Sequence, residues 1–144
     1  MTDRKDYFQS DDEIRTLAAS FENCSLPDDD FDHRAHLAVA VWYLSSMTPE
    51  EAADRMRAGL LRFLAHYKVD PQKYNETITQ FWVRRLDKLL SQTDPTLPLF
   101  ARANQAIERA GSSQVIFDHY TRELLFSEEG RTSWVEPDLK LMES

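Results

Sequence analysis

The pattern of apolar positions predicts an all-α chain with one helix that is apolar on every side. Residues 37–44 contain no polar position apart from the hydroxyl of a tyrosine. A helix without a polar face is buried, because no side of it can face water. Periodicity alone does not distinguish such a run from a buried strand. The length of the run to Met47 and its recurring alanines favour a helix. The acids before it, Asp32 among them, supply an N-cap and suit the helix dipole. We therefore predict a buried central helix over about residues 32–47.

Amphipathic stripes and capping signals predict four or five more helices packed around this one. Thr48-Pro49-Glu50-Glu51 combines a capping box with a proline at the first helical position. Gly111 follows a helical stripe at the position where glycine commonly ends a helix. Gly59, inside a helix, predicts a close helix crossing. The predicted ranges are about 11–23, 32–47, 49–67, 70–91, 97–110 and 113–120, with a last turn from Ser127.

Length and composition predict a single helical domain spanning residues 1–144. We expect residues 1–10 to be flexible and residues 134–144 to form an extended tail that Trp134 pins to the bundle. The single cysteine excludes an internal disulfide and, with no signal-peptide pattern, favours the cytoplasm. No run is long enough to span a membrane. The net charge of −8 argues against general binding of nucleic acid.

Histidines and one glutamate from three predicted helices form a candidate metal site. His33 and His36 lie one turn apart on the same helix face, so both could bind one ion. Glu76 and His119 would complete a set of three nitrogens and one carboxylate, which suits zinc or non-haem iron. The Glu-x-x-His pairs of di-iron bundles are absent from the chain. The sequence therefore allows a single-metal site at His33, His36, Glu76 and His119.

A polar pocket that binds a small molecule without a metal is the working hypothesis. Glu76 as a base, with His36 as its partner, would permit acid–base catalysis. Pockets of this kind are mostly apolar with a few placed polar groups. The other predicted lining residues are Tyr74, Asn75, Thr79, Trp42 and Trp82. Whether the protein is an enzyme is left open by this pattern.

The same residues also have structural interpretations, and a third function needs no pocket. His36 could be a buried neutral histidine with one hydrogen bond, and Glu76 could pair with Lys73 or Arg84 at the surface. A protein-interaction or self-association module would present an exposed apolar patch. The candidate residues for that patch are Leu97, Leu99, Phe100, Phe126 and Trp134.

Four short motifs in fixed order resemble a family of small, uncharacterised bacterial helical proteins. They are Phe31-x-His33-x-x-His36-Leu37, Tyr74-Asn75-Glu76-Thr77-Ile78-Thr79 with Trp82, His119-Tyr120-Thr121-x-Glu123-x-Leu125, and Trp134-Val135-Glu136-Pro137-Asp138. The resemblance covers about residues 28–139 and implies a compact helical domain, but it implies no activity. Similar sequences often have histidine where this chain has Asn75, so a metal site here would lack one ligand.

Overall fold

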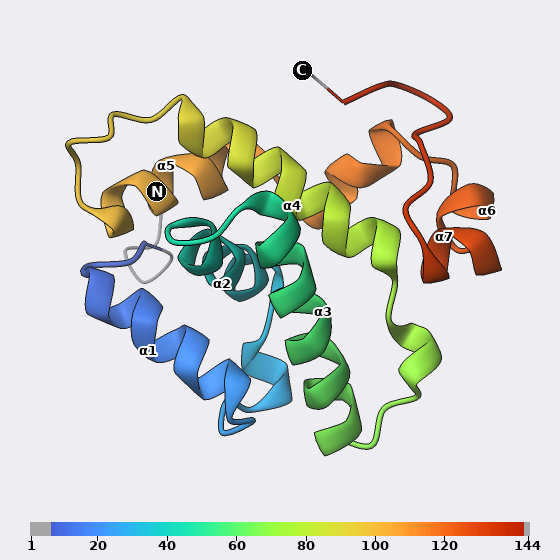
Figure 1. Cartoon of the computed structure of the whole chain (residues 1–144), viewed down its shortest axis with the longest axis horizontal. Coiled ribbons are helices and arrows are strands. Elements are labelled where there is room, and N and C mark those ends of the chain that lie inside the picture. The colour runs from blue at the N-terminus through green and yellow to red at the C-terminus, as the bar shows by residue number, and fades with distance from the viewer. Residues whose placement is uncertain (1–6, 143–144) are drawn as a thin grey trace.

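The computed structural model describes residues 7–142, which are helical with no strand (Figure 1). The all-α prediction is therefore confirmed. Five helices have twelve residues or more, and α6 and α7 are short helices of one turn or slightly more. The α-helices are α1 (Asp11–Glu22), α2 (His33–Leu44), α3 (Pro49–His66), α4 (Glu76–Ser91), α5 (Leu99–Ala110), α6 (Arg122–Leu125) and α7 (Glu128–Thr132). The 3₁₀ helices are η2 (Asp28–Asp30), η3 (Pro71–Lys73) and η4 (Ser113–Asp118).

α2 and α4 contribute more buried residues to the interior than the other helices do. α2 is buried along most of its length, as its uninterrupted apolar run predicts, and it packs against α1, α3, α4 and α5. Its N-cap is Asp32, whose Oδ1 accepts a hydrogen bond from Ala35 N at 2.9 Å. α4 packs against α2, α3, α5 and α7. The packing therefore does not single out α2 as the only central helix.

Capping signals explain most of the helix ends, and one predicted start is wrong. Thr48 and Glu51 form the predicted capping box, with the two hydrogen bonds at 3.1 and 3.0 Å. Gly111 follows α5 with φ of 84°, a left-handed conformation that glycine adopts without strain. The Asp70-Pro71 signal starts only η3, because Tyr74 and Asn75 are extended. α4 begins after Asn75, which caps it by accepting a hydrogen bond from Ile78 N.

The close crossing predicted at Gly59 is confirmed where α1 meets α3. A Cβ added at Gly59 would lie 2.5 Å from Phe21 Cε2. Phe21 is fully buried and stacks on Phe31, with ring centroids 4.6 Å apart. The absence of a side chain at Gly59 therefore lets the aromatic core extend to the surface of α3.

The described part of the N-terminal stretch, residues 7–10, contacts the folded chain through Phe8, and its flexibility stays a prediction. Residues 1–6 lie outside the described range. Phe8 is 6% exposed, and two hydrogen bonds with Asn104 hold its backbone. Phe8 N donates to Asn104 Oδ1 at 3.0 Å, and Asn104 Nδ2 donates to Phe8 O at 2.9 Å. This reciprocal pair ties the chain to α5 before α1 begins.

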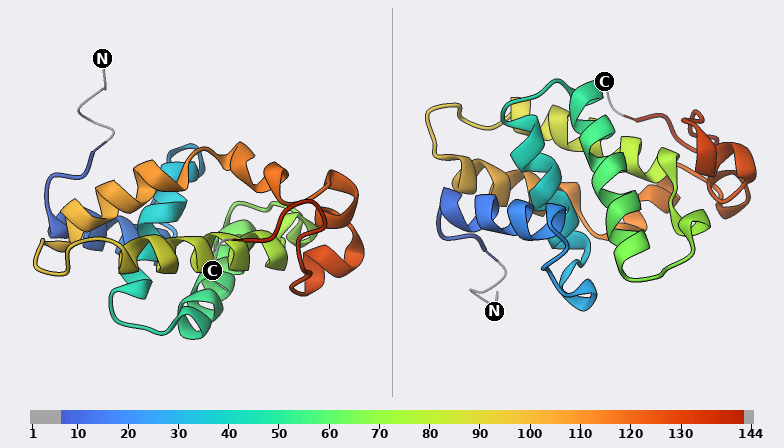
Figure 2. Two further views of the ribbon diagram at one scale, coloured as in Figure 1. Left: turned by 90° about the horizontal axis from the view of Figure 1, so that it is seen from above. Right: turned by 60° about the horizontal axis from the view of Figure 1, so that its bottom comes forward.

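Residues 119–142, the C-terminal segment, form one end of the molecule beside the N-terminal half of α4 (Figures 1 and 2). Residues 134–142 contain no helix, as the predicted extended tail requires, and residues 143–144 lie outside the described range. Side chains fasten this segment. His119 Nδ1 donates to Lys140 O at 2.8 Å, and Tyr120 Oη donates to Val135 O at 2.6 Å. Trp134 packs against Tyr120, which agrees with the predicted pinning. In the described residues, no helix is both long and apolar enough to cross a membrane.

Candidate functional site

The Glu76 carboxylate, at the start of α4, is the centre of the largest polar network among the predicted site residues. It is 5% exposed, and four hydrogen bonds reach its two oxygens. Arg57 of α3 donates two of them in a bidentate pair, at 2.8 Å to Oε1 and 2.7 Å to Oε2. Tyr74 Oη donates to Oε1 and Gln80 Nε2 donates to Oε2, each at 2.6 Å. Each oxygen of the carboxylate thus accepts two hydrogen bonds, and its ion-pair partner is Arg57, not Lys73 or Arg84.

The electrostatics of this network keep Glu76 ionised and its donors protonated. Burial by itself would raise the pKa of Glu76, but the hydrogen bonds from Arg57, Tyr74 and Gln80 outweigh it and lower the pKa. Burial, and then the hydrogen bond to Glu76, raise the pKa of Tyr74. At neutral pH the network therefore holds one carboxylate, one guanidinium and one neutral phenol, and it offers no base with a pKa near neutrality.

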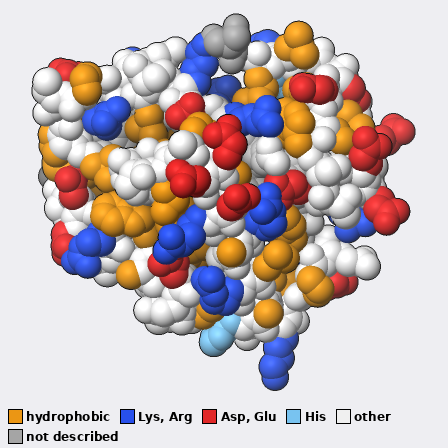
Figure 3. Space-filling model, in the orientation of Figure 1, with side chains coloured by type: hydrophobic (Ala, Val, Ile, Leu, Met, Phe, Trp, Pro, Cys, Tyr) orange, Lys and Arg blue, Asp and Glu red, His pale blue; other side chains and the backbone are white. Residues whose placement is uncertain are grey.

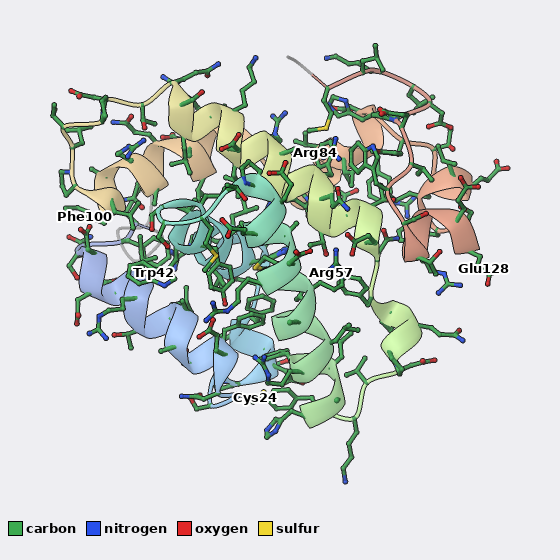
Figure 4. The ribbon with its side chains drawn as sticks, in the orientation of Figure 1. Cys24, Trp42, Arg57, Arg84, Phe100 and Glu128 are labelled. Atoms are coloured by element: carbon green, nitrogen blue, oxygen red, sulfur yellow. The ribbon has the colours of Figure 1, made fainter. Side chains whose placement is uncertain are left out.

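A groove of about 580 Å³ opens beside this network, between α3, the start of α4 and the C-terminal segment. Its volume is in the range usual for small-molecule sites. Tyr74, Glu76 and Gln80 line it from the α4 side, with Arg57 and Leu61 from α3. The remaining lining residues are Pro71, Gln72, Arg131, Thr132, Ser133 and Trp134. Figure 4 shows Arg57 in the space between α3 and α4. We call this cavity the Arg57 groove.

Only two of the predicted catalytic and ligand-binding residues, Tyr74 and Glu76, line the Arg57 groove. His36 is not among the hydrogen-bond partners of Glu76, so the predicted acid–base pair is not formed. The His36 ring instead lies 5.7 Å from that of Phe31. Burial, and then the nearby His33, lower the pKa of His36 to about 4. His36 is therefore a neutral, partly buried histidine at physiological pH.

The other predicted ligand-binding residues do not line the groove either, and each contacts another part of the fold. They are Asn75, Thr79, Trp42 and Trp82. Asn75 caps α4, and its Nδ2 donates to Leu125 O at 2.8 Å, which fixes α6. Thr79 Oγ1 donates to Asn75 O within the helix. Trp82 is 2% exposed. Trp42 packs against the core and lies on the other side of α3 from Arg57 in the view of Figure 4.

The predicted metal ligands are not brought together. In residues 7–142 there is no group of three or more His, Cys, Asp and Glu side chains that could hold a metal ion. His33 Nε2 donates to Gly111 O at 3.0 Å, and its ring packs on Trp82. His119 is 5% exposed, and its Nδ1 bonds the C-terminal segment. The zinc or iron site predicted at His33, His36, Glu76 and His119 therefore has no assembled ligand group in the described residues. His33 and His119 instead make hydrogen bonds to backbone carbonyls that hold the fold together.

The apolar residues predicted as an interaction patch do not share one exposed surface. Leu99, Phe100 and Trp134 are partly buried against the core. Leu97 is half-buried in the loop before α5, whereas Phe126, after α6, is 48% exposed.

Sequence reasoning missed Arg57 and the part that Arg131, Thr132 and Ser133 take in lining the groove. Arg57 sits on the polar side of α3, where arginines are common and carry no special pattern. Only its position one helix away from a buried glutamate distinguishes it, and that position depends on the fold.

Comparisons with models of protein families, with curated proteins and with solved structures found no match. The resemblance to a bacterial helical family therefore stays a prediction.

Proposed function

We propose that the Arg57 groove binds a small organic molecule that has an apolar body and an acidic group. Leu61, Pro71 and Trp134 supply apolar contacts. Arg131, which reaches into the same lining, supplies a positive charge that the Glu76 network does not neutralise. Binding is favoured over acid–base catalysis, because Glu76 is held ionised by four donors and lacks a histidine partner.

The observation that carries this proposal is the ion pair between Arg57 and Glu76, two residues that line the groove, in which the carboxylate is buried and the guanidinium is partly exposed. Arg57 and Glu76 are joined at 2.7 Å, with their side chains 37% and 7% exposed. Buried ion pairs are often no more stabilising than apolar residues of similar size, so they are weak evidence for a purely stabilising role. A pair that fixes a guanidinium and a carboxylate below a groove of ligand size instead gives the groove a rigid polar base.

Binding can be tested with 2-naphthoate, which has the proposed chemistry, and with neutral 2-naphthalenemethanol as its matched probe. The chain has three tryptophans, so the ¹H–¹⁵N spectrum contains three indole N–H signals that Trp→Phe variants assign. Trp134 Nε1 is buried without a hydrogen-bond partner, which makes its signal sensitive to a change beside it. We expect 2-naphthoate to shift the Trp134 signal more than the Trp42 and Trp82 signals, and the neutral probe to bind at least threefold more weakly.

A negative charge placed in the groove should weaken this binding without unfolding the protein. Leu61 is 40% exposed and lines the groove, so Leu61→Asp introduces an unfavourable carboxylate at little cost in packing. Leu139→Asp is the matched control, because Leu139 is 57% exposed and lies outside the groove lining. We expect at least a tenfold weaker Kd for 2-naphthoate in Leu61→Asp and no change in Leu139→Asp. Equal affinities in the two variants, or shifts confined to Trp42 and Trp82, would disprove the proposal.

A further inference from the structure

A second cavity, of about 340 Å³, lies between α4, α5 and the end of the C-terminal segment. Four of the residues that line it are basic: Arg84, Arg85 and Lys88 on α4 and Arg109 on α5. Leu89 and Met142 supply apolar walls, and no Asp or Glu is among the lining residues. We call this cavity the basic pocket. It is separate from the Arg57 groove, with which it shares no lining residue.

The charge of the basic pocket is opposite to that of the chain. The sequence has 25 acidic and 17 basic residues, yet four of the basic ones converge here. In the described residues, none of the four forms an ion pair with a carboxylate. Figure 3 shows basic and acidic side chains interspersed over the visible face, with several acidic ones on the side where α6 and α7 lie. Like charges repel one another, so this convergence is unfavourable unless an anion offsets it.

Two of the guanidinium groups are held in place by neutral partners. Arg85 Nε donates to Ala110 O at 3.0 Å, at the C-terminal end of α5. Arg84 stacks over Trp134, 3.8 Å from the ring centroid, and its Nη2 donates to Gln80 Oε1 at 3.0 Å. Figure 4 shows Arg84 beside α4 near the C-terminal segment. These contacts position the two groups, and neither guanidinium forms an ion pair with a carboxylate in the described residues.

Helix dipoles account for part of this arrangement. Lys88 and Arg109 lie in the last turns of α4 and α5, where a positive charge interacts favourably with the helix end. The dipole does not explain Arg84, which lies at the middle of α4 and points to the same cavity. Nor does it explain why no acidic residue lines the cavity in so acidic a chain.

We propose that the basic pocket binds the phosphate group of a small phosphorylated molecule. A dianionic phosphate group offers several acceptor oxygens, and guanidinium groups bind such oxygens in bidentate fashion. The volume admits a phosphate with a short organic remainder, and Leu89 and Met142 are placed to contact that remainder. The same phosphate chemistry could come from a free phosphomonoester or from a lipid headgroup.

Calorimetric titration of the full chain with inorganic phosphate and with phenyl phosphate tests the proposal, at constant ionic strength and with chloride as the competing anion. Arg109→Gln and Lys88→Gln each remove one positive charge from the pocket lining. Lys73→Gln is the matched control, because Lys73 is exposed and lines neither cavity. We expect each pocket variant to weaken the Kd for phosphate about tenfold, as the loss of one charged hydrogen bond does, and Lys73→Gln to leave it unchanged within twofold.

Tighter binding of phenyl phosphate than of inorganic phosphate would support contact with the apolar walls. A vesicle arm distinguishes the two sources of phosphate: binding to phosphatidic acid vesicles but not to phosphatidylcholine vesicles, lost in Arg109→Gln, would assign a lipid headgroup. No heat of binding with either soluble probe and no retention by phosphatidic acid vesicles would overturn the proposal. Equal affinity of Arg109→Gln, Lys88→Gln and the native chain would overturn it as well. Neither result depends on ligand binding in the Arg57 groove, whose test uses other residues and another probe.

Discussion

The substitution Glu76→Gln tests whether the network below the Arg57 groove stabilises the protein through its charge. Glutamine keeps the size of the side chain and leaves the helix start intact. Its amide nitrogen, however, must face either Arg57 Nε and Tyr74 Oη or Arg57 Nη2 and Gln80 Nε2, which are all donors to the native carboxylate. At least one pair of donors therefore loses its acceptor.

The expected cost follows from the exposure of the two partners. Removing one partner of a fully buried ion pair costs about 3–5 kcal/mol, because the other charge is left uncompensated. Here the Arg57 side chain is 37% exposed, so water hydrates the remaining charge, and its Nη1 still bonds Asp54. We therefore expect the free energy of unfolding to fall by about 2 kcal/mol, which lowers Tm by roughly 6 °C for a chain of this size.

Urea unfolding followed by circular dichroism, with Glu76→Gln, Arg57→Met and the double variant, measures this cost. A coupling free energy above about 1 kcal/mol between the two positions is expected for an ion pair that is mutually required. Glu76 has a lowered pKa in the folded protein, so its contribution is present above the ordinary value of 4.5 and is lost as the pH falls through the folded value. The difference between the native chain and Glu76→Gln should therefore shrink below that pH. Additive single effects, or a difference independent of pH, would refute the reasoning.

Three further predictions concern the structural contacts. The pKa of His36 is lowered from the ordinary value of 6.5 to about 4, so between these two pH values protonation favours the unfolded chain. The free energy of unfolding should therefore fall as the pH falls through that range. By NMR, the Cε1–H signal of His36 should not titrate between pH 8 and 5. Gly59→Ala should cost about 1–2 kcal/mol, because the clash with Phe21 exceeds the gain in helix propensity, and in a Phe21→Leu background the same change should become neutral or stabilising in urea unfolding. Asn75→Asp should keep the α4 cap but lose the hydrogen bond to Leu125 O, whereas Asn75→Ala should lose both. We expect the free energy of unfolding to fall by about 1 kcal/mol in Asn75→Asp and by about 2–3 kcal/mol in Asn75→Ala. Amide exchange in α6 should be faster in both variants.

The regular part of the fold was predictable because its signals are local. The capping box at Thr48, the glycine at 111 and the apolar run of α2 each act within a few residues, and each is seen in the structure. The start of α4 was missed because two cap signals, Asp70 and Asn75, lie five residues apart. A tertiary hydrogen bond to Leu125 distinguishes the second, and the sequence does not show it.

The candidate site was predictable only in part, because burial of a polar residue does not reveal its partner. Glu76 and Tyr74 were singled out correctly as residues of one polar group, but the cation that joins them is Arg57, from α3. A histidine in an apolar run looks the same whether it binds a metal or a carbonyl. His33 and His119 bind carbonyls, and that outcome depends on where residues 111 and 140 pass.

Five of the polar residues in the sequence motifs serve one architectural purpose. Each donates a hydrogen bond to a backbone carbonyl in a part of the chain that lacks long helices. The pairs are His33 with Gly111, Asn75 with Leu125, Thr77 with Gly130, His119 with Lys140 and Tyr120 with Val135. Short helices and extended segments leave carbonyls without regular partners, and buried carbonyls require donors. Three of these bonds, from His33, Asn75 and Thr77, hold residues 111–130 against α2 and α4, and the other two join parts of the C-terminal segment to each other. It follows that a ligand is better sought at charged residues that the motifs omit, Arg131 of the Arg57 groove and the four cations of the basic pocket, because none of them forms an ion pair with a carboxylate in the described residues.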